Sequence, residues 1–407
     1  MDRKRYSKPE LLAPAGDLLR LKTAVDYGAD AVYLGGKQYS LRSRASNFTH
    51  EDIREACAYA NQRGVHVHVT VNESPHDRDL EGLEDYVRFL QDAGVTAIIA
   101  ASPAVMRLAK KTAPKLEVHA STQCSILNSA AANAMIKRTG CDRVVLAREC
   151  SLEEIRQIQK ETNKDIEVFI HGGMCVNFSG RCTLSNRMTL RDANRGGCAQ
   201  SCRWNYEVCT ADQPISTEDS FFTLGSRDLS AARYLPELME IGVKSLKIEG
   251  RMKTEYYVAS VVSALRHMID ELYETQKPLS EERMNYHLRE VLAAQNREVW
   301  DGFLNNPDGV DSIIYHANSD ADVSHAFLGT AKSCRDGMLE IETRNPIDPG
   351  DRIEVLEPGK ANRVFECRFL RDEEGNELAV SRVPMRRIFM PVPFEIATGA
   401  LLRKAAV

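Results

Sequence analysis

Short apolar runs alternate with longer amphipathic segments along the first two thirds of the chain. The runs are rich in β-branched residues, which is typical of parallel strands that are buried on both faces. The segments between them place apolar residues at helical spacing, as the segment from Leu80 through Val87 to Leu90 does. Eight strands are predicted in this part of the chain: Leu11–Ala13, Ala31–Leu34, Val65–Val71, Ala97–Ala100, Leu116–His119, Val144–Ala147, Ile166–Ile170 and Ser245–Ile248.

Capping residues mark the ends of several predicted helices. Thr49 and Ser151 each precede acidic residues, which predicts an N-cap at both positions. A glycine can close a helix in the left-handed conformation. Five predicted helices end at such a glycine just before the next strand: Gly28, Gly64, Gly94, Gly140 and Gly242. The repeated strand–helix unit favours a TIM-type (β/α)8 barrel over a doubly wound open sheet.

Two departures from this repeat predict the remaining organisation. The seventh and eighth strands are separated by a cysteine-rich insertion, 172–229, which a barrel would place at its catalytic face. After the barrel (1–275), a polar stretch predicts a helical linker (276–322), and alternating runs with proline–glycine turns predict a small all-β, barrel-like domain (323–407). The strands expected there are Gly329–Ala331, Met338–Thr343, Arg352–Leu356, Val364–Leu370 and Leu378–Arg382.

The charge balance and the absence of long apolar runs narrow the class of protein. The 407 residues include 53 Lys and Arg and 58 Asp and Glu, a net charge of −5, which excludes a globally basic nucleic-acid binder but not a local basic patch. No run approaches the ~18 apolar residues of a membrane span. No signal-peptide apolar region follows the basic start, so a cytoplasmic protein without a membrane partner is expected.

Four of the eleven cysteines are clustered in the insertion. Cys175, Cys182, Cys198 and Cys202 follow the spacing Cys-x6-Cys-x15-Cys-x3-Cys and are flanked by glycines, so they can converge on one metal centre. An iron–sulfur cluster, a structural zinc ion and a set of small buried residues all remain open at this point. Zinc fits less well, because only the last pair has the short spacing that zinc sites prefer.

The same insertion is locally basic. Five arginines stand against Asp192 alone between residues 171 and 206, a local charge of five minus one, or +4. Arginine binds phosphate and carboxylate groups bidentately, so these side chains are candidate substrate ligands. They are Arg181, Arg187, Arg191, Arg195 and Arg203. Trp204 and Tyr206 add aromatic surfaces on which a base can stack.

Polar residues also follow the predicted barrel strands. The C-terminal ends of barrel strands meet at one mouth, so these residues are expected to line an active site. The candidates for proton transfer or substrate orientation are His171, Lys247, Glu249 and Arg251. The candidates for substrate binding are Asn72, His119, Gln123, Arg148 and Glu149.

These motifs resemble peptidase family U32, and within it the branch that hydroxylates tRNA. The resemblance covers almost the whole chain and is most specific in the cysteine stretch and in the last barrel strand. The matching stretches are Glu10–Gly16, Ala31–Gly36, His119–Gln123, Val145–Cys150, His171–Trp204 and Ser245–Lys253.

The resemblance implies an oxygen-independent hydroxylase with a 4Fe–4S cluster bound by four cysteines. The positions that match are Cys175, Cys182, Cys198 and Cys202. It also implies a tRNA anticodon loop as substrate, 5-hydroxyuridine at the wobble position as product, and prephenate as the small carboxylate that supplies the hydroxyl. A paralogous partner subunit is expected in some members.

We therefore expect a tRNA-modifying hydroxylase. A uridine of a single-stranded loop would flip out of its stack and enter the active site at the barrel mouth. Other expectations stay open. The substrate of such a hydroxylase can instead be ribosomal RNA or a quinone precursor. The family name suggests a peptidase or collagenase, although no nucleophile motif supports one. A third alternative is a metal-stabilised scaffold that binds RNA without altering it.

Overall fold

All eight predicted barrel strands are present in the computed structural model, which describes residues 5–41, 47–211, 213–217, 221–295, 297–305 and 327–405. Neighbouring strands run parallel, and the sheet closes because β9 pairs with both β1 and β7. The fold is therefore a closed (β/α)8 barrel, as predicted, and not an open sheet. The barrel strands are β1 (Glu10–Pro14), β2 (Ala31–Gly35), β3 (His66–Val71), β4 (Ala97–Ala100), β5 (Glu117–Ala120), β6 (Arg143–Val145), β7 (Asp165–Gly172) and β9 (Ser245–Ile248).

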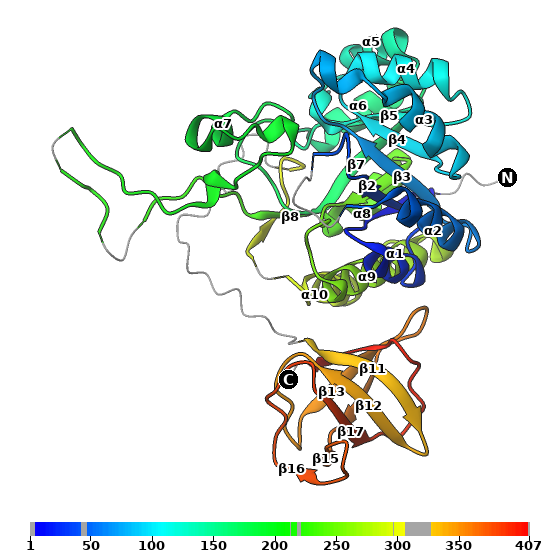
Figure 1. Cartoon of the computed structure of the whole chain (residues 1–407), viewed down its shortest axis with the longest axis vertical. Helices are drawn as coiled ribbons and strands as arrows, with labels where there is room; N and C mark the ends of the chain where they lie inside the picture. Colours follow the sequence, from blue (N-terminus) through cyan, green and yellow to red (C-terminus); the bar gives the residue numbers. More distant parts are fainter. Residues whose placement is uncertain are drawn as a thin grey trace.

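Helices surround the barrel and end where the sequence predicts (Figure 1). Thr49 and Ser151 both form capping boxes. Gly140 and Gly242 close their helices with φ of 71° and 84°. One boundary differs, because Leu80 lies in the 3-10 turn η1 (Asp77–Leu80) and the helix starts at Leu83. The helices are α1 (Leu18–Asp26), α2 (His50–Asn61), α3 (Leu83–Asp92), α4 (Pro103–Thr112), α5 (Ser129–Thr139), α6 (Leu152–Glu161), α8 (Leu235–Ile241) and α9 (Glu255–Thr275).

The insertion between β7 and β9 folds across the C-terminal ends of the barrel strands. Its elements are short: α7 (Leu184–Thr189), η3 (Ala193–Arg195), η4 (Ser201–Arg203) and β8 (Asp228–Ser230). Strand β8 pairs antiparallel with the end of β7 and parallel with β10 (Val299–Trp300). Between η4 and β8 the described residues 205–211, 213–217 and 221–222 form a hairpin arm, with β-bridges Tyr206–Phe222 and Cys209–Pro214. The arm projects away from the barrel (Figure 1).

The C-terminal part is a single curled antiparallel sheet. The run predicted over Val364–Leu370 splits into two short strands, and of the run predicted over Leu378–Arg382 only Leu378 lies in a strand, β16. Strands β17 and β18 are not predicted, because each combines a few apolar residues with charged ones. The order is β14-β13-β18-β11-β12-β17-β15-β16. The strands are β11 (Phe327–Arg335), β12 (Met338–Thr343), β13 (Arg352–Leu356), β14 (Arg363–Glu366), β15 (Leu370–Arg371), β16 (Glu377–Leu378), β17 (Arg387–Pro391) and β18 (Leu401–Lys404).

The stretch predicted as a helical linker contains α10 (Glu281–Leu292). This helix packs against α9, and Val291 belongs to the same hydrophobic core as the barrel. The part of the predicted linker beyond residue 305 lies outside the described residues. No helix among the described residues is long and apolar enough to cross a membrane.

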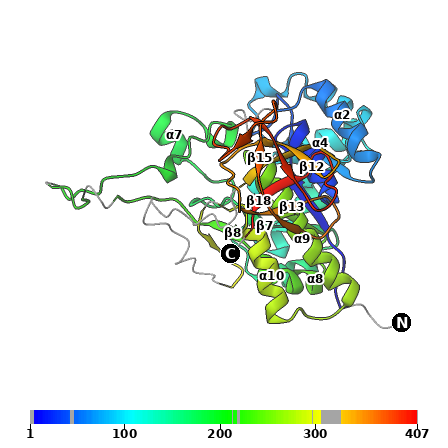
Figure 2. The same ribbon diagram turned by 90° about the horizontal axis from the view of Figure 1, so that it is seen from below.

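The curled sheet lies against the α9–α10 side of the barrel (Figure 2). Arg403 of β18 is fully buried there, and its guanidinium lies 2.7 Å from the Glu290 carboxylate of α10 and 2.7 Å from that of Glu354. The ring of Phe327 stacks on Tyr256, with centroids 4.9 Å apart. One buried cation therefore joins the two parts of the chain.

Removing this cation is expected to destabilise the protein strongly. In Arg403→Met, the carboxylates of Glu290 and Glu354 lose their shared cation, and Glu290 keeps a neutral donor in Asn362; this change is expected to lower the free energy of unfolding by about 3–5 kcal/mol. Urea unfolding monitored by fluorescence measures the change. Arg387→Met is the matched control, because Arg387 pairs with Glu340 but is 57% exposed, and its loss is expected to lower that free energy by less than about 1 kcal/mol. Equal effects of the two substitutions would contradict the assignment.

Candidate active site

A cavity of about 200 Å³ opens at the mouth of the barrel, between the strand ends and the insertion. Most of its surface is apolar, with walls that include Tyr33, Ile99, Val145 and Phe169. Polar side chains from the ends of several strands converge on it, as expected for a barrel active site. Those among the predicted site residues are Asn72, Gln123, Arg148, Glu149, Lys247, Glu249 and Arg251.

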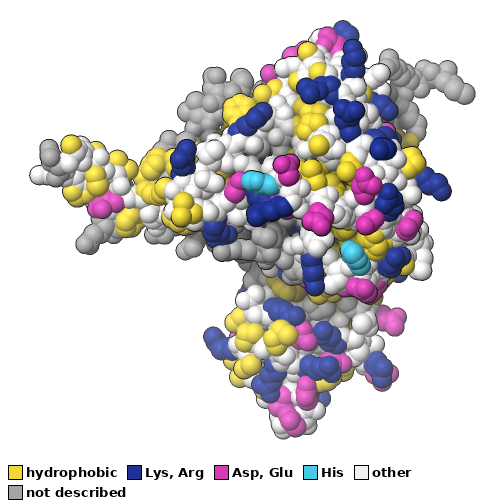
Figure 3. Space-filling view, turned by 45° about the horizontal axis from the view of Figure 1, so that its top comes forward, with side chains coloured by type: hydrophobic (Ala, Val, Ile, Leu, Met, Phe, Trp, Pro, Cys, Tyr) yellow, Lys and Arg dark blue, Asp and Glu magenta, His cyan; other side chains and the backbone are white. Residues whose placement is uncertain are grey.

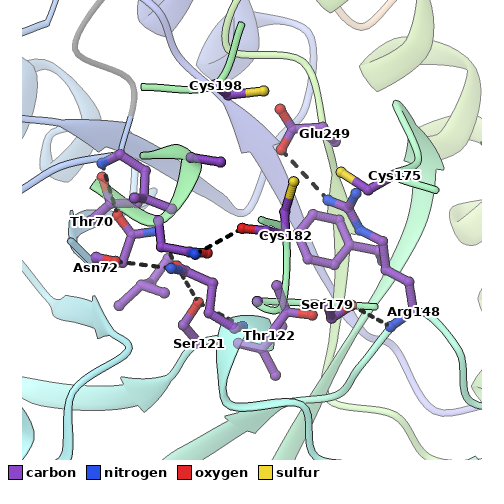
Figure 4. A pocket seen from close by; sticks show the side chains of 18 of the residues that line it. Thr70, Asn72, Ser121, Thr122, Arg148, Cys175, Ser179, Cys182, Cys198 and Glu249 are labelled. Atoms are coloured by element: carbon purple, nitrogen blue, oxygen red, sulfur yellow. Dashed lines mark hydrogen bonds and ion pairs between the residues drawn. The ribbon is translucent and has the colours of Figure 1, made fainter. Parts of the chain in front are cut away.

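Three of the four clustered cysteines line the cavity: Cys175, Cys182 and Cys198. Their sulfur atoms face a common space beside Glu249 (Figure 4). Cys202 does not line the cavity but lies near the other three. Burial raises the pKa of its thiol, and the neighbouring cysteines raise that pKa further. The structure therefore brings the four predicted ligands together, and an all-thiolate donor set is what zinc and iron–sulfur clusters bind.

The loop between Cys175 and Cys182 is held on the barrel by glycine and by hydrogen bonds. Gly180 has a φ of +75°, and a Cβ at this position would lie 2.2 Å from the carbonyl oxygen of Gln123. Glu149 accepts hydrogen bonds from the backbone N–H and the hydroxyl of Ser179, each at 2.9 Å. The side chain of Asn177 donates to the sulfur of Cys182 at 3.3 Å. Only glycine fits at position 180, so this close contact fixes the position of the loop on the barrel.

Arg148 and Glu249 form a loose ion pair beside the cysteines. Their charged groups lie 3.8 Å apart, and the Arg148 guanidinium also donates to the carbonyl oxygen of Gly173 at 2.7 Å. It lies 3.9 Å from the centre of the Phe169 ring. The Tyr33 hydroxyl shares its one proton between the backbone carbonyl oxygen of Ile248 at 3.0 Å and the Glu249 carboxylate at 3.2 Å. A carboxylate held in this way, in a mostly apolar cavity, can accept or return a proton.

Lys247 and Arg251 form the inner wall of the cavity, and both are buried. The Lys247 ammonium lies 2.8 Å from the carboxylate of Glu167, deeper in the barrel. Arg251 donates to the Asn47 side chain at 2.7 Å and to the Ser40 hydroxyl at 3.1 Å. These contacts fix both cations in place at the edge of the cavity.

Two predicted histidines do not line this cavity. His119 is fully buried below it, 3.1 Å from Glu117 and edge-on to His68. His171 is also buried, and its ring stacks on Tyr257 of α9 at 5.9 Å. A register shift in the pairing of β7 with β9 lies between Phe169 and His171. The roles predicted for the two histidines remain predictions.

The five insertion arginines do not line the cavity either, and they have separate surroundings. Arg195 pairs with Glu73 and Asp79, at 3.1 and 2.7 Å. Arg203 lies 3.6 Å from the buried carboxylate of Asp228. Arg191 donates to the carbonyl oxygen of Cys198 at 3.4 Å. Arg181 and Arg187 are exposed, so these two are placed to meet a phosphate from solvent.

The hairpin arm differs from the rest of the insertion in charge. The sequence between Trp204 and Gly225 contains no Lys or Arg and has four acidic residues. Exposed apolar side chains stand along the arm, with Ile215 63% and Phe221 43% exposed (Figure 3). The run of arginines in the insertion therefore ends at Arg203, before the arm begins.

His171 is expected to make the protein sensitive to acid. Burial lowers its pKa to about 4, whereas an unfolded histidine titrates near 6.5. Between these two pH values the unfolded chain binds a proton at this histidine and the folded chain does not. The stability that is present above pH 6.5 is therefore lost as the pH falls toward 4. Between pH 7.5 and 5, wild type is expected to lose about 2 kcal/mol more of its unfolding free energy than His171→Phe. Urea unfolding at both pH values measures this, and the same substitution at exposed His76 should leave the wild-type dependence unchanged.

Comparison with known proteins agrees with this architecture. The model of peptidase family U32 matches residues 16–313, and that of the peptidase family U32 C-terminal domain matches residues 323–403. The tRNA hydroxylation protein P1 of Bacillus subtilis is 40% identical over 98% of this chain and 95% of its own length. The 23S rRNA 5-hydroxycytidine C2501 synthase of Escherichia coli is 38% identical over 67% of this chain and 41% of its own length. A collagenase of Porphyromonas gingivalis is 31% identical over 88% of this chain and 90% of its own length.

Proposed function

The chain belongs to peptidase family U32, and from this premise we propose that it hydroxylates a pyrimidine base in RNA. The proposal depends on one observation above all. Three clustered cysteines face the same mostly apolar cavity as the polar side chains of the barrel mouth. The names of two relatives, one a tRNA hydroxylation protein and one an rRNA 5-hydroxycytidine synthase, support RNA as the substrate.

The substrate we favour is tRNA in the cytoplasm, with a wobble uridine converted to 5-hydroxyuridine without molecular oxygen. The relative that spans 98% of this chain is named for tRNA, which supports this choice over ribosomal RNA. A base in a single-stranded anticodon loop unstacks at little cost and can enter a cavity of this kind. Prephenate is the hydroxyl source that we propose. Its carboxylates suit the cationic wall formed by Arg148 and Arg251.

We propose a 4Fe–4S cluster as the metal centre, bound by Cys175, Cys182, Cys198 and Cys202. Four thiolates on one zinc ion, at Zn–S distances of about 2.3 Å, would lie about 3.8 Å apart. In the described part of the chain, no three cysteine sulfurs lie within 4.8 Å of one another. This wider spacing suits a larger cluster, and the side-chain N–H of Asn177 on the Cys182 sulfur is the kind of contact that tunes one.

The side chains of this protein would bind, orient and protect the base. An iron–sulfur cluster supplies electron transfer or a Lewis-acidic iron. Glu249, next to the cysteines, is placed to take the proton that leaves the carbon being hydroxylated. Arg148 holds that carboxylate from one side and Tyr33 from the other. The apolar walls exclude water from the reacting atoms.

A peptidase is the less favoured activity for this site. Serine and cysteine peptidases commonly place a histidine in contact with the nucleophile. Among the described residues that line the cavity there is no histidine. The cavity's serines at positions 121 and 179 are engaged with Gln123 and Glu149.

Mass spectrometry of RNA nucleosides tests the proposed function. Nucleosides from tRNA and from ribosomal RNA are compared between cells with and without this gene. Loss of 5-hydroxyuridine and its derivatives from tRNA, restored by the wild-type gene, is the expected result. Loss of a hydroxylated base from ribosomal RNA alone would move the proposal to that substrate. Unchanged nucleosides in both RNAs, in a strain without a redundant relative, would overturn it.

A further inference from the structure

Two amide side chains meet at the edge of the cavity. Asn72 directly follows β3, and Gln123 lies in the turn η2 (Thr122–Cys124) after β5. The Asn72 amide nitrogen donates to the Gln123 side-chain oxygen at 2.7 Å. The Gln123 amide nitrogen donates to the backbone carbonyl oxygen of Asn72 at 3.1 Å. Both residues line the cavity, and Figure 4 shows Asn72 there.

Backbone partners fix the orientation of both amides. The backbone N–H of Leu41 donates to Asn72 at 3.3 Å, and a backbone N–H can only donate, so the atom that it meets is the Asn72 oxygen. The backbone carbonyl of Asn72 can only accept, so the Gln123 atom that it meets is the nitrogen. Nitrogen and oxygen are thus distinguished by chemistry in each side chain.

A count of the hydrogen bonds shows what the pair still offers. Each amide nitrogen has two N–H groups and uses one of them. The Gln123 oxygen accepts from Asn72 and from the Ser121 hydroxyl, so both of its lone pairs are used. Among the described residues, the Asn72 oxygen accepts from Leu41 alone. Two N–H donors and one acceptor site are therefore left on side chains that line the cavity.

This set matches the hydrogen-bonding edge of a pyrimidine. The edge of uracil has two acceptors, O2 and O4, and one donor, N3–H. The edge of cytosine also has two acceptors, O2 and N3, and one donor at N4. Guanine reverses the numbers, with one acceptor and two donors. A base that leaves one of these part-buried donors unpaired is bound less tightly, because the donor gives up water without gaining a partner.

We propose that the Asn72–Gln123 amide pair binds the hydrogen-bonding edge of the pyrimidine base that is modified. This inference rests on the proposed function and assigns the subsite that recognises the base. Because both amides have a fixed orientation, we assign the pair to uracil; the cytosine edge has the same number of acceptors and donors but in a different order. The apolar walls, including Tyr33, Ile99 and Val145, are then left for the faces of the ring.

The amide pair is also connected to the cysteine loop. Gly180 packs directly on the backbone of Gln123, and Asn72 lies beside Gln123. A base that is bound by its edge here is therefore held in a fixed relation to the loop from Cys175 to Cys182. Asn72 and Gln123 act as binding residues, and Glu249 remains the group placed for proton transfer.

A chemical double-mutant cycle tests this subsite through binding. The probes are two anticodon stem-loop RNAs, one with uridine at the target position and one with 4-thiouridine, which keeps O2 and N3–H and replaces O4 by sulfur, a much weaker acceptor. Their affinities are measured for the iron-loaded wild-type protein and for the variants Asn72→Asp and Gln123→Glu, each of which replaces an amide N–H donor by a carboxylate oxygen. The cycle isolates the contact between base and side chain from any general effect of either change.

Wild type is expected to bind the uridine RNA about tenfold more tightly than the analogue. In at least one of the two variants this preference should fall below about twofold, because its donor to O4 is gone. If both variants keep the wild-type preference, the amides do not contact the base and the inference is overturned. A variant that only disturbs the fold weakens both RNAs equally. Gln157→Glu, on the exposed face of α6, adds the same charge and should keep the preference.

The failure of this inference can be told apart from failure of the proposed function. If wild type binds neither stem-loop and alters no RNA, the proposed function fails. If wild type hydroxylates RNA but the preference for O4 is the same in both variants, only the amide subsite is wrong. Iron content, measured on every preparation, shows that the metal centre is intact in each case.

Discussion

Cys182→Ala is expected to lose both its iron and its ability to hydroxylate RNA. The Cys182 sulfur faces the cavity beside Cys175, Cys198 and Glu249, so its loss leaves a cluster with three protein ligands. Changes to residues that only orient metal ligands already lower activity about 10- to 100-fold, and the loss of a ligand is expected to lower it by more than about 100-fold. Iron analysis, visible absorption and nucleoside mass spectrometry of the complemented strain measure the effect.

Cys209→Ala is the matched control for this substitution. Cys209 is an exposed cysteine on the hairpin arm. Its backbone forms an isolated β-bridge with Pro214, and it does not line the cavity. Its replacement should leave iron content and modification at wild-type levels. If Cys182→Ala keeps the wild-type iron content and full RNA modification, the four clustered cysteines do not bind the metal centre.

Glu249→Gln is expected to lower the turnover rate without loss of iron. The change keeps the shape of the side chain but removes its ability to take a proton. General acid–base groups contribute about 10²- to 10⁴-fold, so kcat is expected to fall by that amount while the affinity for RNA changes little. The measurement is single-turnover hydroxylation of a tRNA transcript together with iron analysis.

Glu117→Gln provides the comparison, because Glu117 lies at the opposite end of a barrel strand and contacts His119. Its kcat should stay within about threefold of wild type, since surface changes of this kind have small effects. If Glu249→Gln turns over as fast as Glu117→Gln, then Glu249 does not transfer the proton.

The barrel could be predicted because its strands are short, apolar and evenly separated by amphipathic helices. The curled C-terminal sheet was predicted only in part. Its central strand β18 is four residues long and includes the buried Arg403, whose charge is neutralised by Glu290 and Glu354. Sequence periodicity cannot show that a charge is paired inside a core, so this strand was missed.

The cysteine ligands could be predicted from their spacing, whereas the direction of single strand-end residues could not. Successive side chains in a strand point to opposite faces, and the register shift between Phe169 and His171 alters that alternation. His171 consequently packs on Tyr257 instead of facing the cavity. A single sequence contains no signal for this shift.

The sequence also does not show which residues become ion-pair or hydrogen-bond partners in the folded protein. Five insertion arginines look alike in the sequence, but the structure pairs Arg195 with Glu73 and Asp79 and places Arg203 near Asp228. Asn177 was overlooked because an asparagine between two cysteines has no distinctive pattern. Its contact with the Cys182 sulfur is visible only in three dimensions.

The most direct test is reaction of the purified, iron-loaded protein with an unmodified tRNA transcript and prephenate in the absence of oxygen. Mass spectrometry of the digested RNA then follows the wobble nucleoside. The account predicts the gain of one oxygen atom on that uridine with wild type, and no gain with Cys182→Ala. If neither tRNA nor ribosomal RNA changes while the same preparation cleaves a collagen peptide, the account is wrong and the site is a peptidase.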